Sequence, residues 1–141
     1  MADPARSRVI LEGTSARLET ILAASGYHTD AGLDVRLEES QGPCTAPFLS
    51  IWTAAVIKPD DARASGEREL TLIVEGQVPA SLADARERNE LMADDIERCL
   101  DGFCPPGSAL PLGFSETVFL DRPDGLAVVA CQLMFSTRFR R

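Results

Sequence analysis

Four cysteines, at positions 44, 99, 104 and 131, carry the most reactive side chains of this sequence. Cys99 and Cys104 are separated by four residues, but zinc sites usually combine two closely spaced pairs. Cys44 and Cys131 form no second pair. We therefore expect structural or incidental thiols and no metal ion, with Cys131 as a small residue of the core.

One histidine and several acids are the remaining candidates for acid–base chemistry. His28 has Asp30 and Asp34 nearby in sequence, but no motif places a nucleophile beside it, so we expect an exposed histidine at a strand edge. The sequence also holds three adjacent acidic pairs: Glu38-Glu39, Asp60-Asp61 and Asp94-Asp95. Neighbouring side chains on a helix or strand point apart. We therefore expect the first and third pairs on solvated faces, and nothing supplies the further ligands that a cation at the second would need.

Common catalytic motifs are missing from the sequence. It contains no glycine-rich phosphate-binding loop and no Gly-x-Ser-x-Gly nucleophile motif. The sequence therefore predicts neither an enzyme nor a bound cofactor.

The charge and hydropathy of the chain limit the classes of partner that it is expected to bind. The 141 residues include 22 acidic and 14 basic ones, a net charge of −8. Nucleic-acid phosphates and anionic membranes both attract basic surfaces, so we expect neither specific nucleic-acid binding nor membrane binding. No apolar run reaches the roughly 18–20 residues of a membrane span. Arginines interrupt the first 26 residues, which disfavours a signal peptide and favours a reducing cytoplasm with free thiols.

Hydrophobic periodicity predicts two amphipathic helices. The first begins at Pro4 or Ser7 and ends at Ser25, because apolar residues recur every three or four positions and Gly26 suits a left-handed helix end. The second runs from about residue 81 to residue 100, with Ser81 as its N-cap.

Alternating or continuous apolar segments predict five strands, at residues 33–37, 48–57, 70–78, 112–120 and 126–138. Residues 48–57 are apolar at nearly every position, which favours a strand covered on both faces. Turns are expected at Gln41-Gly42-Pro43 and at Arg122-Pro123-Asp124-Gly125, and a longer loop at residues 58–66. The length suits a single domain, residues 1–141.

The order of these elements predicts the fold class. Short connections favour antiparallel strands, so we expect an α+β fold with a mostly antiparallel sheet and both helices packed on one face. The second face of the sheet is then incompletely covered. We expect it to present Ile57, Ile73, Val129 and Leu133, a surface that would find a partner.

The element order also resembles a known family. An opening helix ends in LETILAASGY and is followed by LDVRLEE, APFLSIWTAAV, ERELTLIVEGQVP, NELMADDIERCL and an arginine-rich final strand, LAVVACQLMFSTRFRR. This layout resembles the tail terminator proteins of long-tailed bacteriophages, the minor tail U protein family, and similar prophage-encoded proteins. The resemblance implies a non-enzymatic protein that forms a ring, typically a hexamer, on the finished tail tube. It further implies a location in the virion tail, assembly in the host cytoplasm, and contacts with the tail tube protein and a head–tail joining protein.

Charge polarity suits such a ring. The segment from Asp84 to Asp101 carries seven acids against three arginines, a net charge of −4, whereas the last four residues carry +3. A head-to-tail ring needs two different complementary patches on each copy. The candidate self-association residues are Asp84, Glu87, Asp94, Asp95, Arg138, Arg140 and Arg141. The candidate partner-binding loop contains Lys58, Asp60, Asp61 and Arg63.

Two other interpretations stay open. A small-molecule-binding or regulatory α+β domain would be favoured by a pocket lined by Trp52, Tyr27 and Phe114, whereas a flat apolar sheet would favour assembly. Another head–tail joining protein is the second alternative. A monomer in solution is compatible with a ring that closes only on its tube.

Overall fold

The computed structural model describes residues 3–38, 44–120 and 127–141. These residues form helices α1 (Arg6–Leu18) and α2 (Ala85–Leu100), short 3-10 helices η1 (Ala23–Ser25) and η2 (Ala31–Leu33), and strands β1 (Val35–Arg36), β2 (Phe48–Ile57), β3 (Glu67–Pro79), β4 (Gly113–Leu120) and β5 (Val128–Arg140). The expected turns at 41–43 and 122–125, and Glu39 of the first acidic pair, lie outside the described residues. None of the described helices is both long enough and apolar enough to span a membrane.

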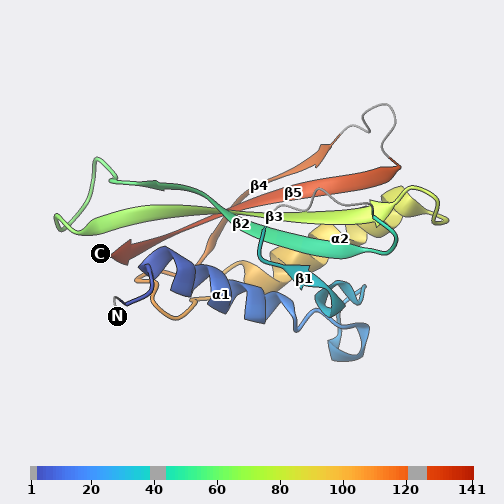
Figure 1. Cartoon of the computed structure of the whole chain (residues 1–141), viewed down its shortest axis with the longest axis horizontal. Helices are drawn as coiled ribbons and strands as arrows, with labels where there is room; N and C mark the ends of the chain where they lie inside the picture. The colour runs from blue at the N-terminus through green and yellow to red at the C-terminus, as the bar shows by residue number, and fades with distance from the viewer. Residues whose placement is uncertain (1–2, 39–43, 121–126) are drawn as a thin grey trace.

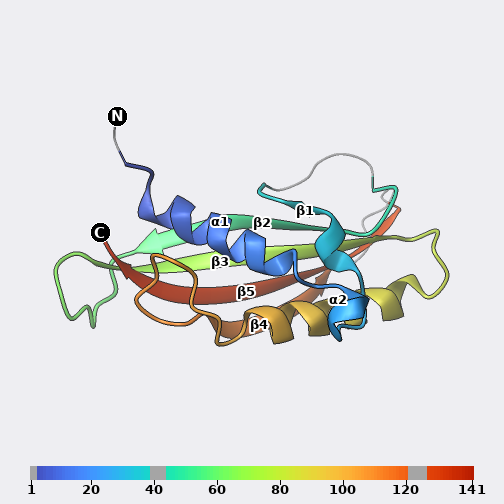
Figure 2. The same ribbon diagram turned by 90° about the horizontal axis from the view of Figure 1, so that it is seen from below.

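The strands form one sheet in the order β1-β2-β3-β5-β4. Only β1 and β2 run parallel, and every other neighbouring pair is antiparallel. Both α-helices lie on the same face of this sheet (Figures 1 and 2). The predicted α+β fold, with a mostly antiparallel sheet and two helices on one face, is therefore confirmed.

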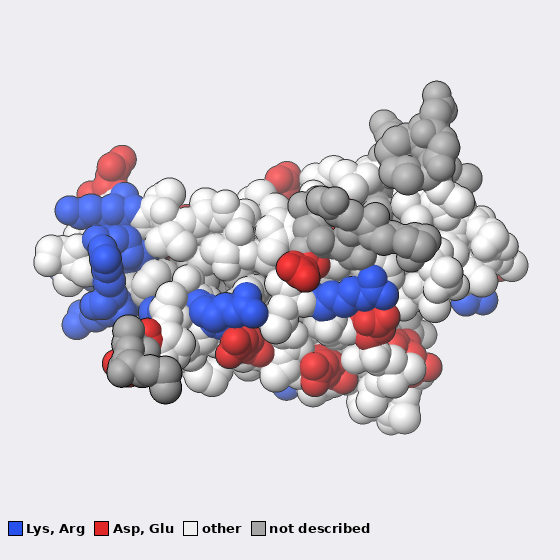
Figure 3. Space-filling model, viewed as in Figure 1, with Lys and Arg blue, Asp and Glu red and all other residues white. Residues whose placement is uncertain are grey.

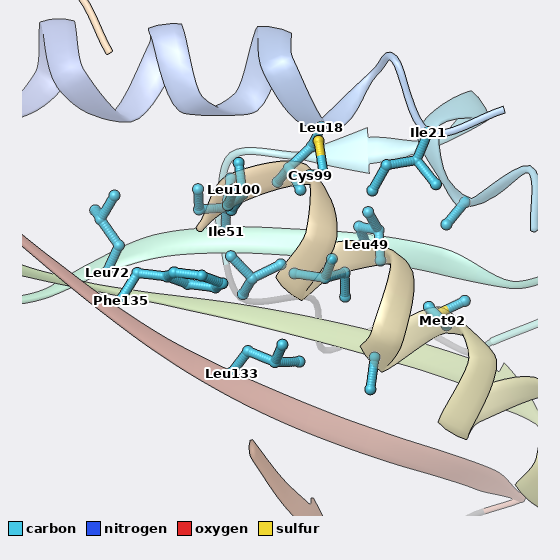
Figure 4. Packing of buried hydrophobic residues seen from close by; sticks show 14 of the residues in the cluster. Leu18, Ile21, Leu49, Ile51, Leu72, Met92, Cys99, Leu100, Leu133 and Phe135 are labelled. Carbon is cyan, nitrogen blue, oxygen red and sulfur yellow. The ribbon is translucent and has the colours of Figure 1, made fainter. Parts of the chain in front are cut away.

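Strands β3 and β5 lie inside the sheet, each with a strand on both sides. They pair along their whole lengths, from Glu67 opposite Arg140 to Pro79 opposite Val128. Leu70, Leu72 and Val74 of β3 are fully buried on the face that carries the helices. Figure 4 shows Leu72, Leu133 and Phe135 of the sheet packed beside residues of α2 and α1.

Helix α2 packs against β3 and β5 through a tight contact at a glycine. A Cβ atom on Gly76 would lie 2.4 Å from the Met92 sulfur, and the Asn89 side chain donates a hydrogen bond to the Gly76 carbonyl (3.1 Å). The helix begins at Ala85 rather than near Ser81, so the N-cap prediction is wrong. Residues 80–84 are turns instead: the Ala80 N–H bonds to the Ala127 carbonyl beside β5, and the left-handed conformation of Asp84 (φ 56°) cannot be part of a right-handed helix.

Helix α1 ends at Leu18, seven residues earlier than predicted. Beyond it the chain turns so that Ile21 is fully buried in the core, and the Gly32 N–H donates to the Ile21 carbonyl (2.9 Å). A straight continuation of the helix would carry Ile21 away from that position. Gly26 does adopt a left-handed conformation (φ 96°), but it ends η1 rather than the long helix.

Strand β2 has the predicted bounds, but only its first half is covered. Phe48 to Ile51 are buried and Thr53 to Ile57 are exposed, so the prediction of cover on both faces is wrong. The predicted strand at 33–37 is reduced to two residues, which pair only with Leu49 and Ser50. The second half of β2 therefore has no strand on its outer side within the described residues.

The second face of the sheet differs from the expectation in two residues. Ile73 and Ile57 lie on that face, but Val129 and Leu133 point toward the helices and are buried. Leu133 is opposite Val74, and Val129 has the same alternation as Cys131 and Leu133. Period-two side-chain alternation therefore places both on the core side.

Candidate assembly surface

The outer side of α2 carries a line of acids. Glu87, Glu90, Asp94, Glu97 and Asp101 recur at steps of three and four residues, so they follow one side of the helix. Among the described residues, no lysine or arginine forms an ion pair with Glu87 or Glu90. Asp84 is also exposed, just before the helix, in a left-handed conformation (φ 56°).

Asp94 and Asp95 have different environments, although both were expected to be solvated. Asp94 is exposed, and one of its carboxylate oxygens lies 3.1 Å from Nε2 of His28. His28 is exposed as expected, but it lies in a bend between η1 and η2 rather than at a strand edge. Asp95 is fully buried. Its carboxylate accepts hydrogen bonds from the backbone N–H of His28 and from the N–H and hydroxyl of Thr29, at 3.0, 2.8 and 2.7 Å. Asp95 thus anchors residues 28–29 to α2 and is not part of the surface.

His28, Asp94 and Asp95 bring one ligand atom each to within 4.8 Å of one another. Both oxygens of Asp95 already accept hydrogen bonds from residues 28 and 29. The geometry is explained by this loop anchor, so the group is a structural contact between α2 and the loop.

Arg138, expected to take part in self-association, instead contacts the candidate partner-binding loop. Its guanidinium donates to Asp61 of the 58–66 loop (2.7 Å) and to Glu67 of β3 (2.8 Å), and lies 3.7 Å from Glu69. Hydrogen bonds from Arg138 lower the pKa of both the Asp61 and Glu67 carboxyls. The same bonds, with Glu67 contributing most, raise the pKa of Arg138. The ion pairs of Arg138 are therefore formed within the chain, and they hold the 58–66 loop against β5.

Other contacts reinforce this end of the hairpin formed by β2 and β3. The backbone N–H of Arg63 donates to the Glu67 carboxylate (3.0 Å), and the Arg141 N–H donates to the Gly66 carbonyl (2.8 Å). Lys58, Asp60, Asp61 and Arg63 are all exposed at the tip. The candidate loop is thus held at Asp61, Arg63 and Gly66 and presents mixed charges to solvent.

A basic groove, which the sequence did not predict, lies at the same end of the molecule. Its volume is about 650 Å³, with Val56 and Phe139 among its apolar lining residues and Arg6, Arg68 and Arg141 among its charged ones. Figure 3 shows basic side chains gathered at the end where both termini lie in Figure 1. Arg6 and Arg68 come from α1 and β3, so only the folded chain brings them to Arg141. Arg140, on the outward side of β5, is exposed beside them in sequence.

The three aromatic residues proposed for a small-molecule pocket do not gather. Phe114 is opposite Phe135, on the side of the sheet with the helices, and their ring centroids are 5.7 Å apart. Trp52 is opposite Ile73, on the other face. Tyr27 packs beneath Arg98 of α2, 5.1 Å from ring centroid to guanidinium carbon. These positions remove the feature that would have favoured a ligand-binding domain.

Comparisons with known proteins bear on the fold. No protein-family model matches the sequence, and a search of curated proteins finds no significant match. A solved chain from the virion of a native gene transfer agent particle superimposes with a TM-score of 0.72 and 14% identity, covering 99% of this chain and 100% of that chain. A second solved structure gives a TM-score of 0.52 and 14% identity, over 92% of this chain and 95% of that chain. Along nearly its whole length, this chain is therefore similar in fold to a chain of a gene transfer agent virion.

Proposed function

We propose that this protein is a structural, non-enzymatic subunit of a phage-like virion, and that it acts as a tail terminator: a ring that caps the tail tube and joins it to the head. The observation that carries the proposal is the full-length similarity in fold to a chain of a gene transfer agent virion. The resemblance of the element order to tail terminator proteins supplies the specific role. The partners are then further copies of the chain, the tail tube protein and a head–tail joining protein.

The charge distribution supports self-association. The acidic line on α2, which includes Glu87 and Asp94, forms one patch together with the exposed Asp84 just before the helix. The other is the basic end with Arg140 and Arg141. Because Asp95 is buried and Arg138 is held by Asp61 and Glu67, we assign neither to the contact. Two unlike patches on one chain permit the head-to-tail repetition that closes a ring.

Two further roles follow from this proposal. The exposed tip of the 58–66 loop is positioned to contact the tube or head protein, since Arg138 holds it in place before any partner arrives. The acidic surface of α2, if it faces the lumen of the ring, would repel the phosphates of passing DNA.

The function is tested on particles. We expect the chain to be found by mass spectrometry in purified particles, and deletion of its gene to give tails without attached heads in electron micrographs. Normal, complete particles from the deletion strain would overturn the proposal.

The charged contact is tested by a charge exchange. Variant one carries Arg140→Glu and Arg141→Glu, and variant two carries Glu87→Lys and Asp94→Lys. Each alone should assemble poorly, because like charges then face each other. An equimolar mixture should recover the oligomer, since every contact again joins opposite charges. Light scattering at low and high salt measures both effects, and wild-type assembly by each variant alone would contradict the charged contact.

A further inference from the structure

Exposed apolar side chains are concentrated on the outer strand β4 and on the second half of β2, which β1 does not cover. Within the described ranges, seven large hydrophobic residues are exposed. Five of them belong to these two stretches: Val56 and Ile57 of β2, and Val118, Phe119 and Leu120 of β4. Their exposed fractions run from 36% at Leu120 to 52% at Ile57. These exposed hydrophobic residues are therefore clustered on two strands rather than spread evenly over the surface.

Both edges also present unpaired backbone. On β2, the partner strand β1 covers only Leu49 and Ser50, so residues 51–57 are open on the outer side in the described structure. On β4, the N–H of Phe114 is bonded to the Asp101 carboxylate (3.1 Å), and no described residue pairs with the outer side of residues 115–120. The two free segments contain seven and six residues, so their lengths differ by only one residue.

Neither segment carries the lysines, prolines or multiple charges that commonly protect an edge strand. Proteins commonly place lysine, proline or several charges on exposed edges to prevent pairing with another chain. Residues 51–57 contain no charged residue and no proline, and residues 115–120 contain a single charge, Glu116. Each edge strand does contain one irregularity, between Thr53 and Ala55 and between Phe114 and Glu116. The apolar ends of both segments lie beyond these irregularities.

The direction and faces of the two edges are complementary. Three successive antiparallel pairings separate β2 from β4, so these strands run in opposite directions in the same sheet (Figure 1). A neighbouring copy placed side by side in the plane of the sheet would therefore present β4 antiparallel to β2. From the register, Ile57, Val118 and Leu120 lie on the open face, and Val56 and Phe119 on the face with the helices. Both faces of such a joint would therefore contain apolar residues, and the antiparallel direction places the apolar ends of the two free segments at opposite ends of a full overlap.

We propose that copies of this chain associate edge to edge, the free segment of β4 in one copy pairing antiparallel with the free segment of β2 in the next. The joint satisfies the exposed N–H and C=O groups of both edges and buries their apolar side chains. It is a head-to-tail contact, because the two edges belong to different strands. This inference rests on the proposed self-assembly. It identifies the contact as strand pairing that continues the β-sheet from one copy into the next.

The proposal is tested by placing a charge on each edge. Val118→Lys and Ile57→Lys should each shift the protein to the monomer mass in light scattering at concentrations where the wild type associates. The matched control is Leu33→Lys, since Leu33 is the most exposed large hydrophobic residue (76%) and lies in η2, off both edges. Circular dichroism and urea unfolding show that the variants fold. Wild-type association by both edge variants, or a wild type that stays monomeric at the highest concentration reached, would overturn the edge joint.

Cross-linking distinguishes this joint from a symmetric one. Ile57→Cys and Val118→Cys are made on separate chains that also carry Cys44→Ser and Cys104→Ser, and a bismaleimide is added to each alone and to the mixture. A dimer formed only in the mixture supports the joint between β2 and β4. A dimer from Val118→Cys alone indicates pairing of β4 with β4 and overturns it, as does no dimer at all. Either failure leaves the virion role intact, because that role is judged by the gene deletion and the particles.

Discussion

The buried carboxylate of Asp95 on α2 accepts hydrogen bonds from both the backbone N–H and the hydroxyl of Thr29, at 2.8 and 2.7 Å. Sixty-six residues separate the two along the chain. With the further bond from the His28 N–H, this carboxylate fixes the segment after η1 against the helix. The neighbouring Asp94 makes only an exposed contact with the His28 ring. Asp95 therefore has a structural role, whereas Asp94 lies on the surface.

Replacing Asp95 should therefore destabilise the protein far more than replacing Asp94. Asp95→Ala leaves the N–H groups of residues 28 and 29 without their partner, and we expect a loss of about 1–3 kcal/mol in the free energy of unfolding. Asp94→Ala, the matched control, should change it by less than about 0.5 kcal/mol because the position is exposed. Urea unfolding followed by circular dichroism measures both. Equal effects of the two substitutions would contradict this role for Asp95.

Gly76→Ala should also destabilise the fold, because its Cβ would lie 2.4 Å from the Met92 sulfur and 3.3 Å from the Cys131 sulfur. We expect a loss of about 1–3 kcal/mol from overpacking. Gly113→Ala is the control: it also lies in a strand, and its Cβ would lie no closer than 3.9 Å to another residue. In a double-mutant cycle, Met92→Ala should make Gly76→Ala less costly, since it removes the clashing sulfur. An unchanged cost would show that Met92 is not the source of the strain.

The sequence predicts the regular parts of this fold because local periodicity determines them. Strand β2 has its predicted bounds, and α2 ends at Leu100 as expected. The end of α1 could not be predicted, because the turn after Leu18 serves to bury Ile21 and to receive Gly32, contacts that depend on the rest of the core. For the same reason a continuous apolar pattern in β2 did not reveal that residues 53–57 lack cover.

The charge of the candidate surface could be predicted from the sequence, but the contacts between its residues could not. The sequence shows that acids follow one side of α2 and that the chain ends in arginines. It cannot show that Arg138 binds Asp61, which is 77 residues away, or that Arg6 and Arg68 join Arg141 at a groove. Such pairs depend on the strand order, which places β5 beside β3 and the hairpin loop beside the last residues of the chain.

The ion pairs of Arg138 should make the hairpin end sensitive to acid. Arg138 lowers the pKa of Asp61 and Glu67 below their ordinary values of 3.8 and 4.5. A lowered pKa in the folded state stabilises it at pH values above the ordinary pKa, and this contribution is lost as the pH falls through the lowered values. Arg138→Gln should therefore destabilise the chain at about pH 7, and the difference from the wild type should shrink toward about pH 3. Urea midpoints across this range measure the effect. Arg140→Gln is the control, and a similar pH-dependent difference there would contradict the assignment to Arg138.

The four thiols should react at widely different rates in the folded protein. Burial raises the pKa of Cys131 to about 12, and its side chain is fully enclosed between β5 and α2. Cys104 is exposed. Because the thiolate is the reactive form, Cys131 should be alkylated at least roughly a thousandfold more slowly than Cys104 at about pH 8. Timed iodoacetamide labelling with peptide mass spectrometry measures the ratio, and labelling in urea provides the control in which the rates converge. Comparable rates in the native protein would mean that the contact between α2 and β5 opens readily, and that the core around Gly76 and Met92 is less tightly packed than its geometry requires.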